Sequence, residues 1–164
     1  MRAHSLSFTG ALVERGFWLY VWHVTSGDRH IVYVGRTGDS SSQYAASPFN
    51  RLGQHLDVRK TASANMLLRH MRKKDIEPIN ATYRLAAVGP IFAEQVDLAT
   101  HRVHRDIVAA MEAALGEYMV TLGFDVVGNT RSKHPLNKAL FDKVLREFKP
   151  QIDQLPAPPR HRVC

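Results

Sequence analysis

The sequence predicts a small α+β domain of a sandwich-like kind. Helices are expected to flank a three-stranded antiparallel sheet, and an extra amphipathic helix follows at the C-terminus. The first observation is a pair of segments, 17–24 and 31–36, that are rich in aromatic and β-branched residues and are separated by a polar break containing Gly27 and Asp28. This pattern is typical of a β-hairpin. The second observation is that apolar residues recur three and four residues apart in later segments, which indicates amphipathic helices.

The first half of the chain supplies the three strands and two short helices. After a lead-in over 1–16 and the hairpin, we expect helices over 48–58 and 62–74 and a third strand over 80–88. Ser47 and Pro48 have the residue types of a helix N-cap and first turn. Gly89 and Pro90 are expected to end the third strand.

The second half is mostly helical. A long helix is expected between 93 and 122 and ends at Gly123, and an extended segment leads to a last helix over 135–148. Lys149 and Pro150 are expected to stop that helix, and a Pro-rich tail follows. His101 and His104 lie three residues apart on the long helix, but no third metal ligand accompanies them, so a solvated face is the expectation.

The composition favours a polyanionic partner. The 164 residues include 22 Lys and Arg against 15 Asp and Glu, a net charge of +7, which favours nucleic acid or an anionic surface. The single cysteine, Cys164, excludes a disulfide framework within one chain and fits a reducing compartment. No apolar run reaches the length of a membrane span, so a soluble, cytoplasmic protein without a membrane partner is expected.

Several polar residues then occur in an informative order. Tyr20 lies in the first arm of the hairpin and Tyr33-Val34-Gly35 in the second; Arg51 and His55 lie one turn apart on the first helix. Glu117 lies within the long helix and Asn129 follows it. In this order the chain resembles the GIY-YIG nuclease superfamily over about residues 17–129, with Trp18-Leu19-Tyr20 where the family has Gly-Ile-Tyr. Trp18 in place of glycine is the main departure.

The resemblance implies a nuclease domain over 17–130. The lead-in before it lies outside the resemblance, as do a C-terminal helix over 131–149, which is expected to pack on the domain, and a tail over 150–164. It implies a metal-dependent endonuclease that hydrolyses DNA, with RNA as an alternative substrate. Glu117 would bind a single divalent ion, Mg²⁺ with Mn²⁺ as a substitute, and Glu112 is the second choice of carboxylate.

The remaining roles are also implied by the resemblance. Arg51 would clamp the scissile phosphate, and His55 would donate to the phosphate, orient a tyrosine or move a proton. Tyr20 would act as general base or orient water, which requires a nearby cation to lower its pKa from about 10. Tyr33 would position water or phosphate.

Nucleic-acid contacts are expected from five side chains: Arg36, Asn129, Arg69, Lys73 and Lys74. For the basic residues at the end of the second helix, a favourable interaction with the helix dipole is the simpler explanation. Two other functions stay open. One is a non-catalytic nucleic-acid-binding module with the same fold and basic surface. The other is an interaction unit whose C-terminal helix docks a protein partner or a second copy in a homodimer.

Overall fold

A four-stranded mixed sheet forms the centre of the fold. The structure, a computed structural model, describes residues 3–39, 42–128 and 131–157. The strands are β1 (Gly16–Ser26), β2 (Arg29–Arg36), β3 (Thr82–Ala93) and β4 (Val126–Val127), and their order in the sheet is β3-β1-β2-β4. The helices are α1 (Pro48–His55), α2 (Met66–Lys73), α3 (Leu98–Thr121) and α4 (Lys138–Ile152). The predicted α+β class is confirmed.

The sheet has one strand more than the prediction. The hairpin β1–β2 and the antiparallel pairing of β3 with β1 are as expected. The extended segment after α3 adds β4, which pairs in parallel with β2 through Val32 and Val126. A two-residue strand carries too short a pattern to be recognised in the sequence, because alternation needs about four residues to be visible.

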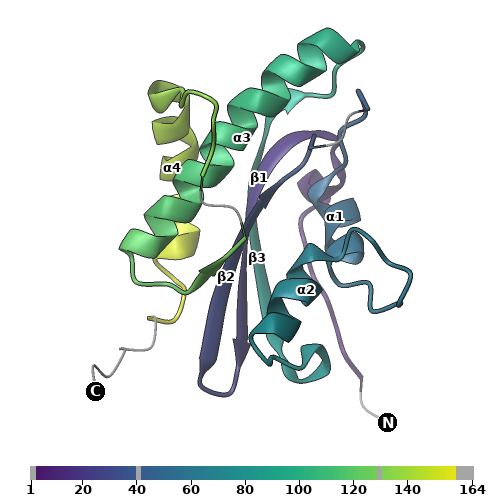
Figure 1. Ribbon diagram of the computed structural model, residues 1–164, viewed down its shortest axis with the longest axis vertical. Coiled ribbons are helices and arrows are strands. Elements are labelled where there is room, and N and C mark those ends of the chain that lie inside the picture. The colour runs from purple at the N-terminus through teal and green to yellow at the C-terminus, as the bar shows by residue number, and fades with distance from the viewer. Residues whose placement is uncertain (1–2, 40–41, 129–130, 158–164) are drawn as a thin grey trace.

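The helices form two layers, one on each face of the sheet (Figure 1). On one face, alternate strand residues such as Leu19, Val21 and Val34 form a core with α3 and α4. On the other face, Tyr20 and Tyr33 join the buried side of α2. This division follows from the alternation of side chains along a strand, which places Val34 and Tyr33 on opposite faces.

Two prolines lie inside elements that they were expected to end. Pro90 lies within β3, which is an edge strand, so its missing N–H group need not cost a ladder hydrogen bond. Pro150 lies in the last turn of α4, which continues to Ile152. Phe148 and Ile152 are both buried in the core, and this packing stabilises the turn despite the proline.

Trp18 is accommodated by a glycine on the neighbouring strand. Its side chain is buried, and a Cβ atom added to Gly89 of β3 would lie 2.7 Å from the Cδ2 atom of the indole. The register of β1 against β3 shifts between Phe17 and Leu19, next to this contact. The departure from the family pattern at position 18 is therefore compatible with a regular hairpin that presents Tyr20.

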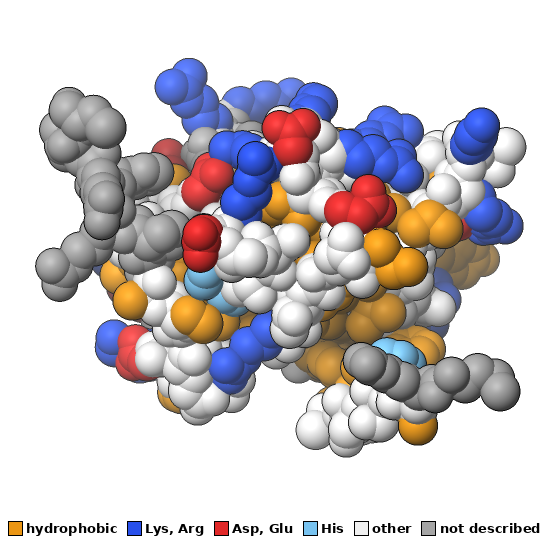
Figure 2. Space-filling view, turned by 90° about the horizontal axis from the view of Figure 1, so that it is seen from below, with side chains coloured by type: hydrophobic (Ala, Val, Ile, Leu, Met, Phe, Trp, Pro, Cys, Tyr) orange, Lys and Arg blue, Asp and Glu red, His pale blue; other side chains and the backbone are white. Residues whose placement is uncertain are grey.

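Residues before β1 cover part of the edge of the sheet. The ring of Phe8 packs on that of Phe49 of α1, with centroids 4.7 Å apart. A cavity of about 940 Å³ lies between this lead-in, α1 and residues 83–89 of β3. Figure 2 shows hydrophobic side chains around a hollow near the N-terminal end, and lysine and arginine side chains along the opposite edge of that view. Within the described ranges, no helix has the length and apolar character needed to cross a membrane.

Candidate active site: a tyrosine–histidine–arginine cluster beside Glu112

Tyr20 lies directly over Gly35. The two residues are cross-strand partners in the hairpin, and the Tyr20 side chain is only 1% exposed. A Cβ atom at position 35 would lie 2.6 Å from Cζ and from the hydroxyl oxygen of Tyr20, a distance that real Cβ contacts do not show. The glycine of the Tyr33-Val34-Gly35 segment is therefore required by the packing of the other tyrosine.

His55 joins the two tyrosines. Its side chain is 0% exposed, and its Nε2 atom shares a hydrogen bond of 2.7 Å with the hydroxyl group of Tyr20. The ring centroid of His55 lies 5.2 Å from that of Tyr33. The predicted N-cap of α1, Ser47, accepts a hydrogen bond from the backbone of Asn50 and so fixes the start of the helix that carries His55.

Burial keeps this pair neutral. It raises the pKa of the Tyr20 phenol well above its ordinary value, although the positive charge of Arg51 lowers it. Burial and then the charge of Arg51 lower the pKa of His55 to about 4. Near neutral pH the pair is thus a phenol hydrogen-bonded to a neutral imidazole, and burial outweighs the cation that was expected to make Tyr20 a base.

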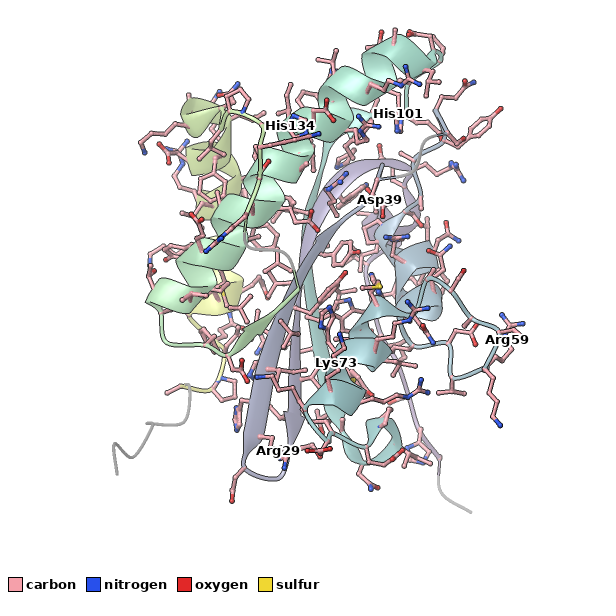
Figure 3. All side chains as sticks on the ribbon, viewed as in Figure 1. Arg29, Asp39, Arg59, Lys73, His101 and His134 are labelled. Carbon is pink, nitrogen blue, oxygen red and sulfur yellow. The ribbon has the colours of Figure 1, made fainter. Side chains whose placement is uncertain are left out.

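Arg51 lies one turn before His55 on α1. Its guanidinium donates to Asp39 (NH2 to Oδ2, 2.7 Å) and to Gln54 (NH1 to Oε1, 3.0 Å). Figure 3 shows Asp39 at the same end of the sheet as the start of α1. Asp39 and Gln54 are contacts that the sequence did not predict, because nothing in the loop over 37–47 distinguishes Asp39 from an ordinary turn residue.

The carboxylate of this cluster is Glu112. Arg36 Nε donates to Glu112 Oε2 at 2.9 Å, and the two side chains are only 16% and 14% exposed. Burial raises the pKa of Glu112, although Arg36 lowers it. Burial and then the negative charge of Glu112 raise the pKa of Tyr33 to about 12. Glu112 is therefore within electrostatic reach of both tyrosines.

The structure does not bring Glu117, the predicted metal ligand, to this cluster. Its side chain is exposed, and five residues along an α-helix turn it by about 140° away from Glu112. Leu115 and Met119 are buried, but residues two apart do not share a helix face, so their burial does not extend to Glu117. Val120, three residues on, is exposed with Glu117. Glu112 has the buried Val108 and Leu115 at the spacings that do share a face.

The predicted nucleic-acid contacts divide into three groups. Arg36 is in the cluster but is paired with Glu112. Arg69, Lys73 and Lys74 lie at α2 and are exposed; Lys74 Nζ also binds Asp125 Oδ2 at 2.7 Å. Figure 3 shows Lys73 on α2, below Asp39. Asn129 lies outside the described residues.

The two histidines of α3 lie elsewhere. His101 is 0% exposed and its ring packs on that of Phe17, and the His104 ring stacks on Phe92 with centroids 4.0 Å apart. The expectation of a solvated face is therefore wrong for His101. The helix begins at Leu98, so this turn packs against the start of β1 rather than projecting into solvent.

No family model, curated protein or solved structure matches this chain. The resemblance to the GIY-YIG superfamily therefore depends on the residues and their geometry alone. The hairpin, α1 and α3 bring together Tyr20, Tyr33, Arg51 and His55, with Glu112 in place of Glu117.

The cluster has the donors of an anion site and two carboxylates, Glu112 and the more exposed Asp39, each paired with an arginine. Among the described residues, the buried atoms Arg36 NH1 and Arg51 Nε have no hydrogen-bond partner. Guanidinium groups bind phosphate oxygens well, so these atoms suit an oxyanion. In the same residues no group of three or more His, Cys, Asp or Glu side chains could hold a metal ion. A divalent ion here would have Glu112 as its protein ligand and would take its other ligands from water and phosphate, as Mg²⁺ does.

Proposed function

We propose that the protein is a metal-dependent endonuclease that hydrolyses phosphodiester bonds, with DNA as the expected substrate. The observation that supports this most is the convergence of two tyrosines, Arg51 and His55 from separate elements beside one half-buried carboxylate, Glu112. These are residue types that the resemblance implies, with Glu112 in place of Glu117.

In this proposal the two arginines bind the scissile phosphate. Arg51 would release Asp39 and bind a phosphate oxygen instead. Arg36 would donate to the phosphate from Nη1, while its Nε atom keeps the hydrogen bond to Glu112. Two guanidinium groups in a partly desolvated position would stabilise the extra negative charge that develops on the phosphate in the transition state.

The phenols orient groups and do not remove protons. Tyr20 is buried, and its raised pKa makes it a hydrogen-bond partner of His55 that fixes the position of that ring. Tyr33, which is slightly more exposed, would hold a water molecule or a phosphate oxygen. A divalent ion bound at Glu112 would supply the activation of water that these neutral groups do not.

The decisive experiment compares two glutamates on one helix. Purified protein with Mg²⁺ or Mn²⁺ is expected to nick supercoiled plasmid. Glu112→Gln, which keeps an oxygen for Arg36, should reduce the rate by at least about 100-fold. Glu117→Gln, on the exposed face, is the matched control and should leave the rate unchanged.

Arg51→Lys should also be inactive, because lysine lacks the planar pair of donors. Circular dichroism spectra and melting curves check that each variant folds. Unchanged cutting by both Glu112→Gln and Arg51→Lys would refute the assignment of the site.

The ion pairs also support a second candidate, a nucleic-acid-binding module without catalysis. In the structure Arg51 forms an ion pair with Asp39, and Glu112 forms one with Arg36. The positive charge of Arg51 and the negative charge of Glu112, both of which hydrolysis needs, are therefore already paired. Binding with a steep dependence on salt, and no cleavage with either metal, would favour this candidate.

A further inference from the structure

A second, polar cavity lies next to the cluster on the outer side of α1. Its volume is about 490 Å³, within the range of small-molecule sites. It is formed by the end of the lead-in, the loop before α1, and α1 with the turn that follows. The side chains that matter here are Arg15, Tyr44, Asn50, Gln54, Asp57 and Arg59.

Gln54 connects this cavity to the candidate active site. Its side chain lines the cavity, and its Oε1 atom accepts the hydrogen bond from Arg51 NH1 at 3.0 Å. Arg51 and Gln54 are three residues apart on α1, so their side chains are neighbours on the helix surface. The cavity therefore lies next to the position of a phosphate bound at Arg51, with the Gln54 side chain between them.

The cavity has a flat ring beside a fixed cation. Tyr44 is 64% exposed and lines the cavity together with Arg15. Arg15 NH2 donates to Glu94 Oε1 at 2.8 Å, and its Nε atom donates to the same carboxylate. An exposed aromatic ring next to an immobilised guanidinium plane suits stacking of a nucleobase, which every base can do.

The same cavity has groups that can read the edge of a base. Ser47 donates to Asn50 Oδ1 at 3.0 Å, and Gln54 Oε1 accepts from Arg51, so both amide oxygens are already used within the protein. Neither amide NH₂ group donates to another of the described residues, so each can donate to a base. Arg59 forms an ion pair with Asp57, which reduces the repulsion between that carboxylate and a nucleic acid. Figure 3 shows Arg59 at the outer side of the molecule, beyond α1.

We propose that this cavity binds one unpaired nucleotide of the strand whose phosphate lies at Arg51. The inference rests on the proposed function and adds a substrate class: single-stranded or bulged nucleic acid, or a duplex from which one nucleotide is flipped out. A base inside a duplex is stacked and paired, so it must leave the stack to enter such a cavity. Stacking on Tyr44 and hydrogen bonds from the two amides would offset part of the free energy that unstacking costs.

The test measures binding in EDTA, so it does not depend on cleavage. Fluorescein-labelled DNA hairpins carry either one unpaired nucleotide or an abasic residue at the same position, and fluorescence anisotropy gives both dissociation constants. The wild-type protein should bind the hairpin with the base about tenfold more tightly. Tyr44→Ala should reduce this ratio to about one, and Tyr44→Phe, which keeps the ring, should retain it.

Two further variants separate this inference from the proposed function. Glu112→Gln should keep the base preference even where it no longer cleaves. Arg102→Ala, on an exposed position of α3, is a charge control and should leave the ratio unchanged.

A ratio near one in the wild-type protein, or a ratio that Tyr44→Ala does not change, would overturn the nucleotide cavity while Glu112-dependent cleavage could still hold. A base preference without cleavage would overturn the endonuclease and leave the cavity. Failure to bind either hairpin would count against both.

Discussion

Gly35→Ala tests whether the two strands of the hairpin fix the position of the Tyr20 hydroxyl group. The added Cβ atom would lie 2.6 Å from Cζ of Tyr20, where ordinary contact begins at 3.4 Å. The ring would have to move by more than about 0.8 Å, because its Cε2 atom lies even closer to the added Cβ atom than Cζ does. The ring is buried, so such a movement disturbs its neighbours and its 2.7 Å hydrogen bond to His55.

The expected cost combines two effects. Overpacking of a buried site costs about 1–3 kcal/mol, and a weakened buried hydrogen bond costs about 1 kcal/mol more. We therefore expect the free energy of unfolding to fall by about 2–4 kcal/mol. For a chain of this size, each kcal/mol corresponds to about 2–4 °C in melting temperature.

Urea unfolding followed by tryptophan fluorescence and circular dichroism gives the free energy directly. Gly53→Ala is the matched control. Gly53 lies in α1 with nothing within 4 Å of the added Cβ atom, so alanine should stabilise the protein by up to about 1 kcal/mol. If Gly35→Ala costs less than about 0.5 kcal/mol, the ring is not held over the backbone and the reasoning fails.

Three other changes address the charges of the cluster. Asp39→Asn removes the ion-pair partner of Arg51, so nucleic-acid binding should tighten and the slope of log affinity against log salt should steepen by about one; an unchanged slope in anisotropy titrations would contradict this. Arg36→Ala leaves the half-buried Glu112 carboxylate without its partner and should lower the free energy of unfolding by about 1–3 kcal/mol, whereas a neutral result would mean that solvent already screens the pair. The pKa of His55 is lowered to about 4 in the folded protein, so the folded state holds this imidazole in its neutral form. The stability that the neutral imidazole contributes is therefore lost as the pH falls from about 6.5 toward 4. Between about pH 7 and 5 the wild-type protein should lose about 2 kcal/mol more than His55→Gln in urea unfolding, and equal losses would refute the assignment.

The sequence was sufficient to predict the hairpin and α1 because their signals are local. Aromatic and β-branched residues alternate through β1 and β2, and Ser47 with Pro48 marks the start of α1. Arg51 and His55 then follow at one-turn spacing. Their convergence with Tyr20 needed only the order of the elements, since α1 packs on the face of the sheet that carries the tyrosines.

The features that the sequence did not predict depend on tertiary contacts. Glu112 and Glu117 both lie on one helix with many small and apolar residues, and only the packing of that helix on β2 distinguishes their faces. The ion pair of Arg51 with Asp39 joins residues twelve positions apart across a loop without periodicity. Pro90 was interpreted as a strand terminator because the sequence does not reveal that β3 is at the edge of the sheet.

The contact between Trp18 and Gly89 links the residue sizes at two positions on different strands. The tryptophan on β1 needs a neighbour without a side chain on β3, and shortening the tryptophan to glycine would open a void between the two strands. Gly89 also has a φ of +155°, a backbone conformation that residues with a side chain rarely adopt, so a larger residue at 89 would be strained even beside a small residue at 18. The space beside β1, the strand that presents Tyr20, thus depends on the residues at both 18 and 89. Both positions must be known to judge whether the hairpin keeps its geometry.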